Sequence, residues 1–270
     1  MNTAILAVSA IALYLVAAGG FGLGVLRAHG APPATLRMHF ALAAAATLLH
    51  AGLLYHNIFT DQGLDVGVFN AASLVGWIVV IILLGASLVR SVHTLLATLL
   101  PVAALAIGLE LTFASERIVP DQAPKGIDLH IALSLLAYSV LTIAALQAIL
   151  LAIADYQLRH KRPLKVMRAL PPLATMETLL FQLIGVGVFL LTLGLISGIL
   201  FVENLFAQHL LHKTVLSLLA WFVFAFLLWG RRYRGWRGRT AVRFTISGFV
   251  LLALGFFGSE VVLQLILHRV

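Results

Sequence analysis

Histidine is the residue type in this chain that is best placed to do chemistry. The 270 residues include ten histidines and no cysteine, so thiolate metal sites and disulfides are excluded. His50 lies inside a long apolar segment, where leaving an ionisable side chain unpaired is costly. Such a residue indicates either a ligand-binding role or a neutral imidazole hydrogen-bonded to a neighbouring helix, and the sequence leaves both interpretations open.

His130 begins a second candidate site. In the segment DLHIALSLLAYSVLTIAALQA, Ser134 and Tyr138 follow His130 at intervals of four residues, so the three side chains form one polar stripe on a helix. A stripe of this kind either orients a histidine ligand or supplies hydrogen bonds between helices. Neutral imidazoles from two different helices, here His50 and His130, are the arrangement that a bis-histidine haem needs.

Other polar groups in apolar surroundings carry weaker predictions. His209, His212 and His268 lie at the ends of apolar segments, which indicates solvated histidines at helix ends. The three-residue spacing of His209 and His212 is also compatible with a weak divalent-metal site. Glu110 and Glu260 lie toward the predicted outer ends of apolar segments, where they line an ion path, extend their carboxylates to the membrane surface or form hydrogen bonds between helices. No Ser-His-Asp order, catalytic carboxylate pair or H-E-x-x-H motif is found, so the sequence gives no support for hydrolase chemistry.

The composition indicates which elements must position these residues. Hydrophobic residues make up 61% of the chain and charged residues 10%, with a mean hydropathy of +1.05, whereas soluble domains are about 45–50% apolar and about 25% charged. We predict an all-α polytopic membrane protein, a single integral-membrane helical domain over residues 1–270, because backbone groups in lipid must be satisfied within helices. Its eight predicted spans are 3–26, 36–58, 66–88, 92–113, 127–154, 175–202, 209–230 and 241–267.

The distribution of charge predicts the orientation. Alternate connections and the helix starts beside them carry fourteen of the eighteen basic residues, five of them in the turn RRYRGWRGR. Because short basic loops stay in the cytoplasm, both termini are predicted to lie outside it. The net charge of +8 is thus explained by topology and by contact with membrane lipid, and nucleic acid is not predicted as a partner.

Two local patterns predict further details. Pro120 and Pro124 predict that the outer loop 114–126 has no regular structure. Gly194 and Gly198 have the G-x-x-x-G spacing that allows close approach of a neighbouring helix.

Three segments resemble the cytochrome c assembly (CcsA-type) family of membrane proteins, and most closely its short, eight-span YpjD/HemX-like branch. They are residues 170–201 (LPPLATMETLLFQLIGVGVFLLTLGLISGILF), the hairpin with KTVLSLLAWFVFAFLLWGR, GWRGR and GFVLLALGFFGS, and the segment that begins DLHIALS. The resemblance covers about residues 36–265. It implies that His130 is an outward-facing haem-ligand histidine.

One segment departs from the CcsA-type pattern. Where the family has a tryptophan-rich, aspartate-containing segment, residues 202–213 read VENLFAQHLLHK. A later ligand position reads Trp229, and His268 matches only loosely. The resemblance therefore implies a role in haem handling or cytochrome c biogenesis, without catalysis of bond formation.

We predict a multi-pass protein of the bacterial inner membrane that binds haem b in the outer half of the bundle. His50 and His130 would ligate the iron, with Ser134 and Tyr138 beside them, and a cytochrome-assembly component is a candidate partner. The alternatives are a subunit or accessory protein of divalent Mg²⁺ or Co²⁺ transport, with a cation-efflux partner and with His212 as a further metal ligand, or a non-catalytic membrane scaffold.

Overall fold

The structure is a computed structural model that describes residues 3–26, 32–61, 63–89, 92–113, 118–120, 126–160, 170–201 and 208–258. Eight helices in these ranges are long and apolar enough to cross a membrane, so the predicted all-α architecture is confirmed. They are α1 (Thr3–Leu26), α2 (Pro33–Ile58), α3 (Val68–Ser87), α4 (His93–Thr112), α5 (Ile127–Arg159), α6 (Leu173–Phe201), α7 (Gln208–Arg234) and α8 (Gly238–Ala253), which the π-helical turn η2 (Leu254–Gly258) continues.

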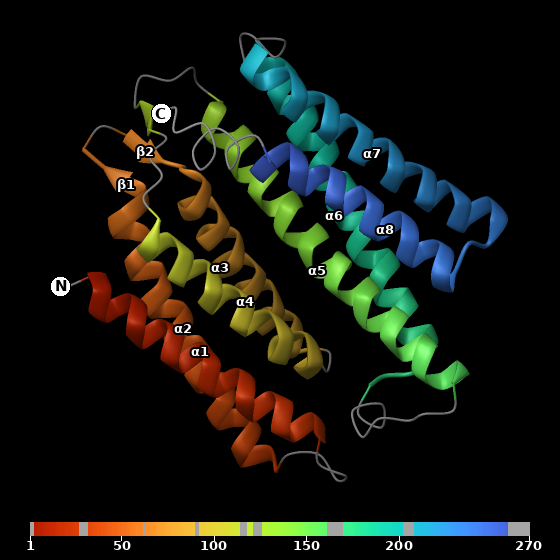
Figure 1. Ribbon diagram of the computed structural model, residues 1–270, viewed down its shortest axis with the longest axis horizontal. Helices are drawn as coiled ribbons and strands as arrows, with labels where there is room; N and C mark the ends of the chain where they lie inside the picture. Colours follow the sequence, from red (N-terminus) through yellow and green to blue (C-terminus); the bar gives the residue numbers. More distant parts are fainter. Residues whose placement is uncertain are drawn as a thin grey trace. The chain divides into compact units, whose positions relative to one another are not determined.

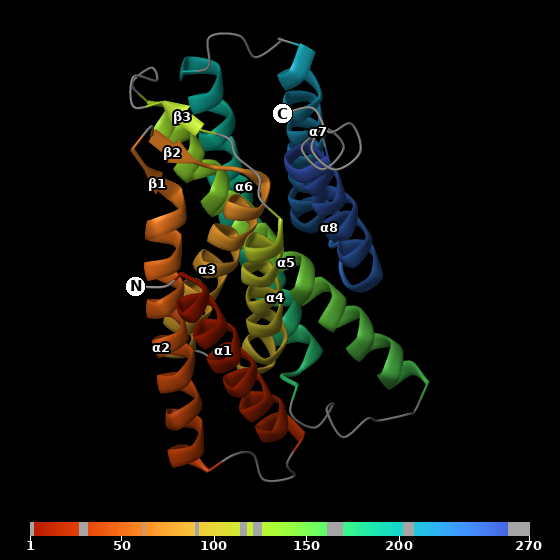
Figure 2. The same ribbon diagram turned by 60° about the vertical axis from the view of Figure 1, so that its left-hand side comes forward.

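The chain divides into two compact units, and the first contains α1 to α4. In this unit α1 packs along α2 and α4, and α3 packs along α4 and α2 (Figures 1 and 2). The α1 residues Ala7, Ala10, Tyr14, Ala17 and Phe21 recur every three or four positions and have no exposed surface. This spacing puts them on one face of α1, and its alanines let the neighbouring backbones approach closely.

The second unit contains α5 to α8 and η2. Here α5 packs along α6 and α8, while α7 packs along α8 and α6. Glycines mark the closest approaches: a Cβ at Gly187 of α6 would lie 2.5 Å from Leu141 Cδ2 of α5, and one at Gly248 of α8 would lie 2.9 Å from the Phe224 ring of α7. Larger side chains at these positions would push the helices apart.

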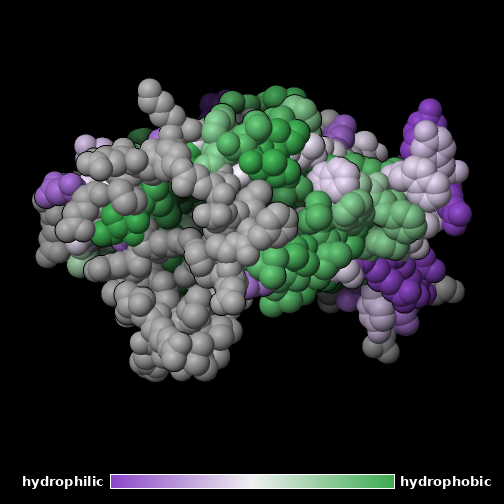
Figure 3. All heavy atoms as spheres, turned by 90° about the horizontal axis from the view of Figure 1, so that it is seen from above, coloured by the Kyte–Doolittle hydropathy of each residue, from purple (hydrophilic) through white to green (hydrophobic). Residues whose placement is uncertain are grey.

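The surface is consistent with a lipid environment. Many of the most exposed large side chains are apolar, among them Leu48 (75% exposed), Ile199 and Leu200 (both 69%). In Figure 3 apolar residues form a broad patch to the right of the grey atoms, and polar residues gather at the right-hand end of the view. Exposed apolar surface of this extent is typical of a membrane-embedded or otherwise covered protein.

The connections between α2 and α3 and between α4 and α5 contain short strands that the sequence did not predict. β1 (Phe59–Thr60), β2 (Gly63–Asp65) and β3 (Ile118–Pro120) form an antiparallel sheet in the order β1-β2-β3 at one end of the first unit. The prediction that residues 114–126 lack regular structure was therefore wrong for 118–120. Pro120 is the last residue of its strand, opposite Gly63, a position where a missing backbone N–H costs the ladder little.

Two helices extend beyond their predicted ends. α5 reaches Arg159 instead of residue 154, and its last turn is supported by the ion pair between Asp155 and Arg159, 2.9 Å apart. α7 reaches Arg234 and α8 begins at Gly238, so the arginine-rich connection shortens to residues 235–237. Long arginine side chains allow this, because their stems lie along apolar surface while their charges reach water.

The orientation of the chain stays a prediction that single-cysteine labelling can test, since the chain contains no cysteine to remove. Asp61→Cys lies in the β1–β2 turn, and Arg237→Cys lies between α7 and α8. The experiment uses cells whose outer membrane has been made permeable and whose inner membrane is intact. A membrane-impermeant maleimide is expected to label Asp61→Cys there, and to label Arg237→Cys only after the inner membrane is disrupted. Labelling of Arg237→Cys in intact cells would reverse the assigned topology.

Candidate functional site

His50 sits in the core of the first unit, where three helices supply its neighbours. Its side chain is 0% exposed. Nε2 lies 2.9 Å from Ser73 Oγ of α3, and Nδ1 lies 3.3 Å from the Tyr14 hydroxyl of α1. Tyr14 is also 3.4 Å from Thr47 Oγ1, which donates to the carbonyl oxygen of Ala43 at 2.7 Å. The residues around His50 thus form one continuous buried hydrogen-bond chain.

This chain gives both ring nitrogens of His50 a partner. Hydroxyl groups donate and accept, so Tyr14 and Ser73 satisfy either neutral tautomer of the imidazole. The sequence left open whether His50 binds a ligand or is a neutral imidazole that hydrogen-bonds to neighbouring helices. The observed contacts are those expected for the hydrogen-bonded imidazole. Iron ligation by His50 would require it to give up its hydrogen bond with Ser73 or with Tyr14, at the cost of one buried hydrogen bond.

His130 has a different environment, in which only one ring nitrogen is engaged. It lies in the first turns of α5, and its Nδ1 is 3.0 Å from the carbonyl oxygen of Gly194 and 3.2 Å from Ser197 Oγ, both in α6. A carbonyl oxygen only accepts, so Nδ1 carries the hydrogen and Nε2 holds the lone pair. Among the described residues Nε2 has no hydrogen-bond partner. Ligand histidines commonly show this arrangement, with the other ring N–H fixed by a backbone carbonyl.

The glycines of α6 make this geometry possible. A Cβ at Gly198 would lie 3.0 Å from Cε1 and 3.3 Å from Nδ1 of His130, so the ring lies directly over this glycine. A Cβ at Gly194 would lie 3.5 Å from Ser134 Oγ. Close packing at the G-x-x-x-G spacing is therefore confirmed. It has a second consequence, because it lets the imidazole reach the Gly194 carbonyl.

The remaining members of the predicted stripe contact different elements. Ser134 is half-buried beside Gly194 of α6. Tyr138 is buried, and its ring centroid lies 5.6 Å from that of Phe249 in α8 and 5.4 Å from that of Phe256 in η2. The hydrogen bonds that hold His130 come from α6, and the sequence pattern on α5 alone could not indicate them.

The weaker candidates have varied outcomes. His212 is exposed in the first turns of α7, and the described residues contain no group of three His, Cys, Asp or Glu side chains that could hold a metal ion. Glu110 accepts a hydrogen bond from Asn57 Nδ2 at 2.6 Å, which is the predicted bond between helices. The side chain of His209 and the whole of Glu260 and His268 lie outside the described residues.

The structure adds an aromatic and imidazole cluster that the sequence did not predict. The ring of Phe21 in α1 stacks on His93 of α4 at 5.9 Å between centroids, with 9° between the planes, and lies 6.0 Å from His39 of α2. Phe40 completes the cluster. His39 is 8% exposed, and its Nδ1 has no hydrogen-bond partner among the described residues. A local pattern could not reveal this cluster, because its members come from three helices.

The donor set of the second unit fits one axial haem ligand. His130 offers an oriented Nε2 with its lone pair available, which is the group that haem iron takes. His50 belongs to the first unit and offers a ring whose two nitrogens are already engaged. The pairing of the two histidines on one iron stays a prediction.

Comparison with known proteins gives a consistent family match. The family model described as "Cytochrome C assembly protein" matches residues 38–267. The chain is 36% identical to "Inner membrane protein YpjD" of Escherichia coli K12 over 264 residues, which cover 97% of this chain and 99% of that protein. It is 34% identical to an "Uncharacterized 28.8 kDa protein" of Azospirillum brasilense over 187 residues, which cover 67% of this chain and 69% of that protein.

A further similarity covers a smaller part of the chain. "Cytochrome c biogenesis protein CcsA" of Gloeobacter violaceus is 33% identical over 92 residues, which cover 33% of this chain and 27% of that protein. Together, the eight apolar helices and the full-length inner-membrane relative place this chain in the inner membrane as a multi-pass protein.

Proposed function

Because the chain belongs to the cytochrome c assembly family of membrane proteins, we propose that it binds haem b in the inner membrane and handles it during cytochrome c biogenesis. Its role is to hold and present haem. The relative named for cytochrome c biogenesis matches a third of the chain, which supports this assignment.

The observation that carries the proposal is the environment of His130. A histidine placed only to join two helices satisfies its hydrogen-bonding groups with those helices. His130 uses Nδ1 for this purpose, while Nε2 has no partner among the described residues. Its orientation is fixed by two acceptors and by the absence of a side chain at Gly198. An imidazole held in this way has little rotational freedom left to lose when it binds a metal.

The chain's own residues would divide the work as follows. His130 is one axial ligand, and Gly194 and Ser197 hold its tautomer and ring orientation. His50 is the predicted second ligand, while Ser134 and Tyr138 would lie beside the bound group on the α5 stripe. Haem itself supplies the iron and the redox chemistry, and the protein's contribution is the choice of ligand and the apolar surroundings.

The purified protein provides the direct test. We expect the chain, expressed with ample iron and haem precursor and purified in mild detergent, to carry a Soret band with the sharp visible bands of six-coordinate, low-spin haem. The pyridine haemochrome spectrum should identify haem b. A monodisperse preparation that shows no Soret band, both as isolated and after addition of haem, would contradict the proposal.

A further inference from the structure

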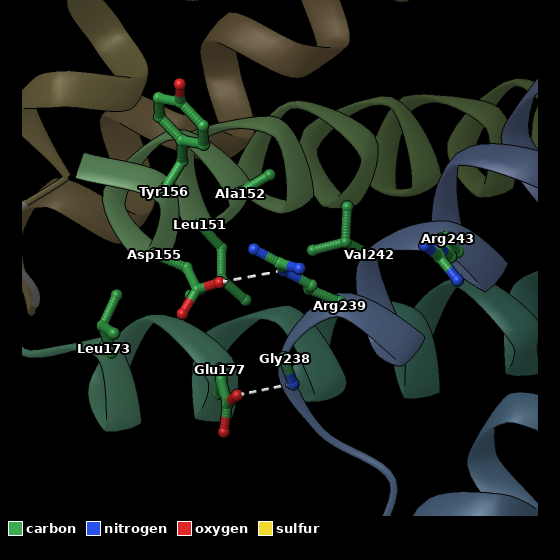
Figure 4. Close-up of a pocket in the computed structure, with 10 residues that line it drawn as sticks. All are labelled: Leu151, Ala152, Asp155, Tyr156, Leu173, Glu177, Gly238, Arg239, Val242 and Arg243. Carbon is green, nitrogen blue, oxygen red and sulfur yellow. Dashed lines mark hydrogen bonds and ion pairs between the residues drawn. The ribbon is translucent and has the colours of Figure 1, made fainter. Parts of the chain in front are cut away.

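One end of the second unit contains a pocket with charged residues on an apolar wall. Its volume is about 310 Å³, at the lower end of the usual range for small-ligand sites, roughly 300–1,000 Å³. Figure 4 shows that the residues come from α5, α6 and the start of α8. The apolar lining is Leu151, Ala152, Leu173 and Val242, and the charged lining is Asp155, Glu177, Arg239 and Arg243.

The charged groups of the pocket are only partly paired with one another. Asp155 contacts Arg159 at 2.9 Å and Arg239 at 3.6 Å, so this carboxylate is satisfied. Glu177 Oε1 accepts a hydrogen bond from the backbone N–H of Gly238 at 2.8 Å, and this carboxylate has no cationic partner among the described residues.

Arg243 is exposed and forms no ion pair with an acidic side chain among the described residues. Figure 4 accordingly draws no dashed line to Arg243. The pocket therefore retains one unpaired charge of each sign.

The location of the pocket relates it to the membrane surface. Asp155 lies in the last turns of α5, Glu177 in the first turns of α6, and Arg239 and Arg243 in the first turns of α8. All three helices are candidate spans, so these residues lie near the ends of spans. Headgroups of the bilayer occupy this level. Leu151 of α5 lies one turn further into its span than Asp155, and Val242 of α8 lies beside Arg243.

We propose that this pocket binds a phosphoethanolamine headgroup, taken from the zwitterionic phospholipid phosphatidylethanolamine. The phosphate pairs with the guanidinium of Arg243, and the primary ammonium donates to the free oxygen of Glu177. Leu151 and Val242 contact the glycerol and the first carbons of the acyl chains. This binding is independent of haem.

The carboxylate of Glu177 selects a zwitterion over an anion. The lining carries two carboxylates and two guanidinium groups, and Asp155 is also paired with Arg159 outside the lining, so an anionic headgroup is opposed only by Glu177. A ligand with a phosphate and no ammonium would leave Glu177 unpaired beside it, at a cost in affinity. Phosphatidylcholine has a quaternary ammonium that lacks N–H donors, so it would pair with Arg243 without hydrogen-bonding to Glu177.

Native mass spectrometry of the full chain, delipidated and then supplied with one lipid at a time, tests the proposal. We expect retention of phosphatidylethanolamine to exceed that of phosphatidylglycerol and phosphatidylcholine by about tenfold, equivalent to about 1.4 kcal/mol. Soluble glycerophosphoethanolamine should compete only at much higher concentration, because it lacks acyl chains. Equal retention of the three lipids would overturn the proposal, and equal competition by the soluble headgroup would assign the site to a free metabolite instead.

Matched variants locate the binding. Arg243→Gln should lower retention of phosphatidylethanolamine about fivefold or more, since it removes the charge-assisted bond to the phosphate. Arg232→Gln, an exposed arginine of α7 outside the pocket lining, should leave it unchanged. Glu177→Gln should remove the preference over phosphatidylglycerol. Indistinguishable behaviour of the Arg243 and Arg232 variants would exclude this pocket, and the lipid comparison on the unaltered chain decides the question even if Glu177→Gln folds poorly.

Discussion

Purified His130→Ala protein is expected to lose most of its haem, with its Soret absorbance per protein falling at least about tenfold. The substitution removes a part-buried imidazole whose Nδ1 is held by two groups of α6 and whose Nε2 has no partner among the described residues. Removing the hydrogen-bond partner of a metal ligand typically lowers metal affinity about 10- to 100-fold. Removing the ligand itself should lower the affinity for haem by more than that. The measurement is the Soret-to-280 nm ratio together with a haem titration. Added imidazole should restore part of the band, because it can occupy the space that the side chain leaves.

Positioning variants separate ligation from folding in this region. Gly198→Val keeps the imidazole but places a side chain where the His130 ring lies, with Cβ only 3.0 Å from Cε1. It should weaken haem binding and shift the visible bands, while Gly185→Val on the same helix, where a Cβ meets nothing within 4 Å, should not. If haem content is unchanged in both His130→Ala and Gly198→Val, His130 is not a ligand.

His50→Leu is expected to destabilise the protein whether or not haem is present. The substitution leaves the Tyr14 and Ser73 hydroxyls without their imidazole partner in a buried site. Two hydrogen bonds between helices are lost, and such bonds average about 0.6 kcal/mol and reach about 1.7 kcal/mol each, while Tyr14 keeps its contact with Thr47 Oγ1. We therefore expect a loss of roughly 1–4 kcal/mol in the free energy of unfolding, measured by denaturant titration in mixed micelles of the haem-free protein.

The control for this variant is His56→Leu, which changes an exposed histidine on the same helix. It should leave the unfolding free energy nearly unchanged. Comparison of haem content then resolves the two roles of His50. If His50→Leu unfolds more easily yet keeps a six-coordinate spectrum, His50 joins helices and another residue is the second ligand. If it is as stable as the control, the buried hydrogen-bond chain does not act as inferred.

Much of the architecture could be predicted from the sequence, because a bilayer leaves few options. A run of about 20 apolar residues must form a helix in lipid, so composition and length suffice to find the spans. The errors fell where this constraint ends: at Arg159 and Arg234, where charged turns extend helices, and at Leu64 and Val119, which pair in a sheet from distant parts of the chain. The predicted single domain over residues 1–270 and the orientation stay predictions.

The sequence by itself determined that this chain is a histidine-rich, cysteine-free bundle of membrane helices, with His50 and His130 as its notable polar positions. Which of the two histidines keeps a ring nitrogen without a partner among the described residues could be decided only by the tertiary structure. Both are polar residues on apolar helices, and a helical period says which face each occupies, not what that face meets. Tyr14 and Ser73 come from other helices to engage both nitrogens of His50, whereas Gly194 and Ser197 engage one nitrogen of His130.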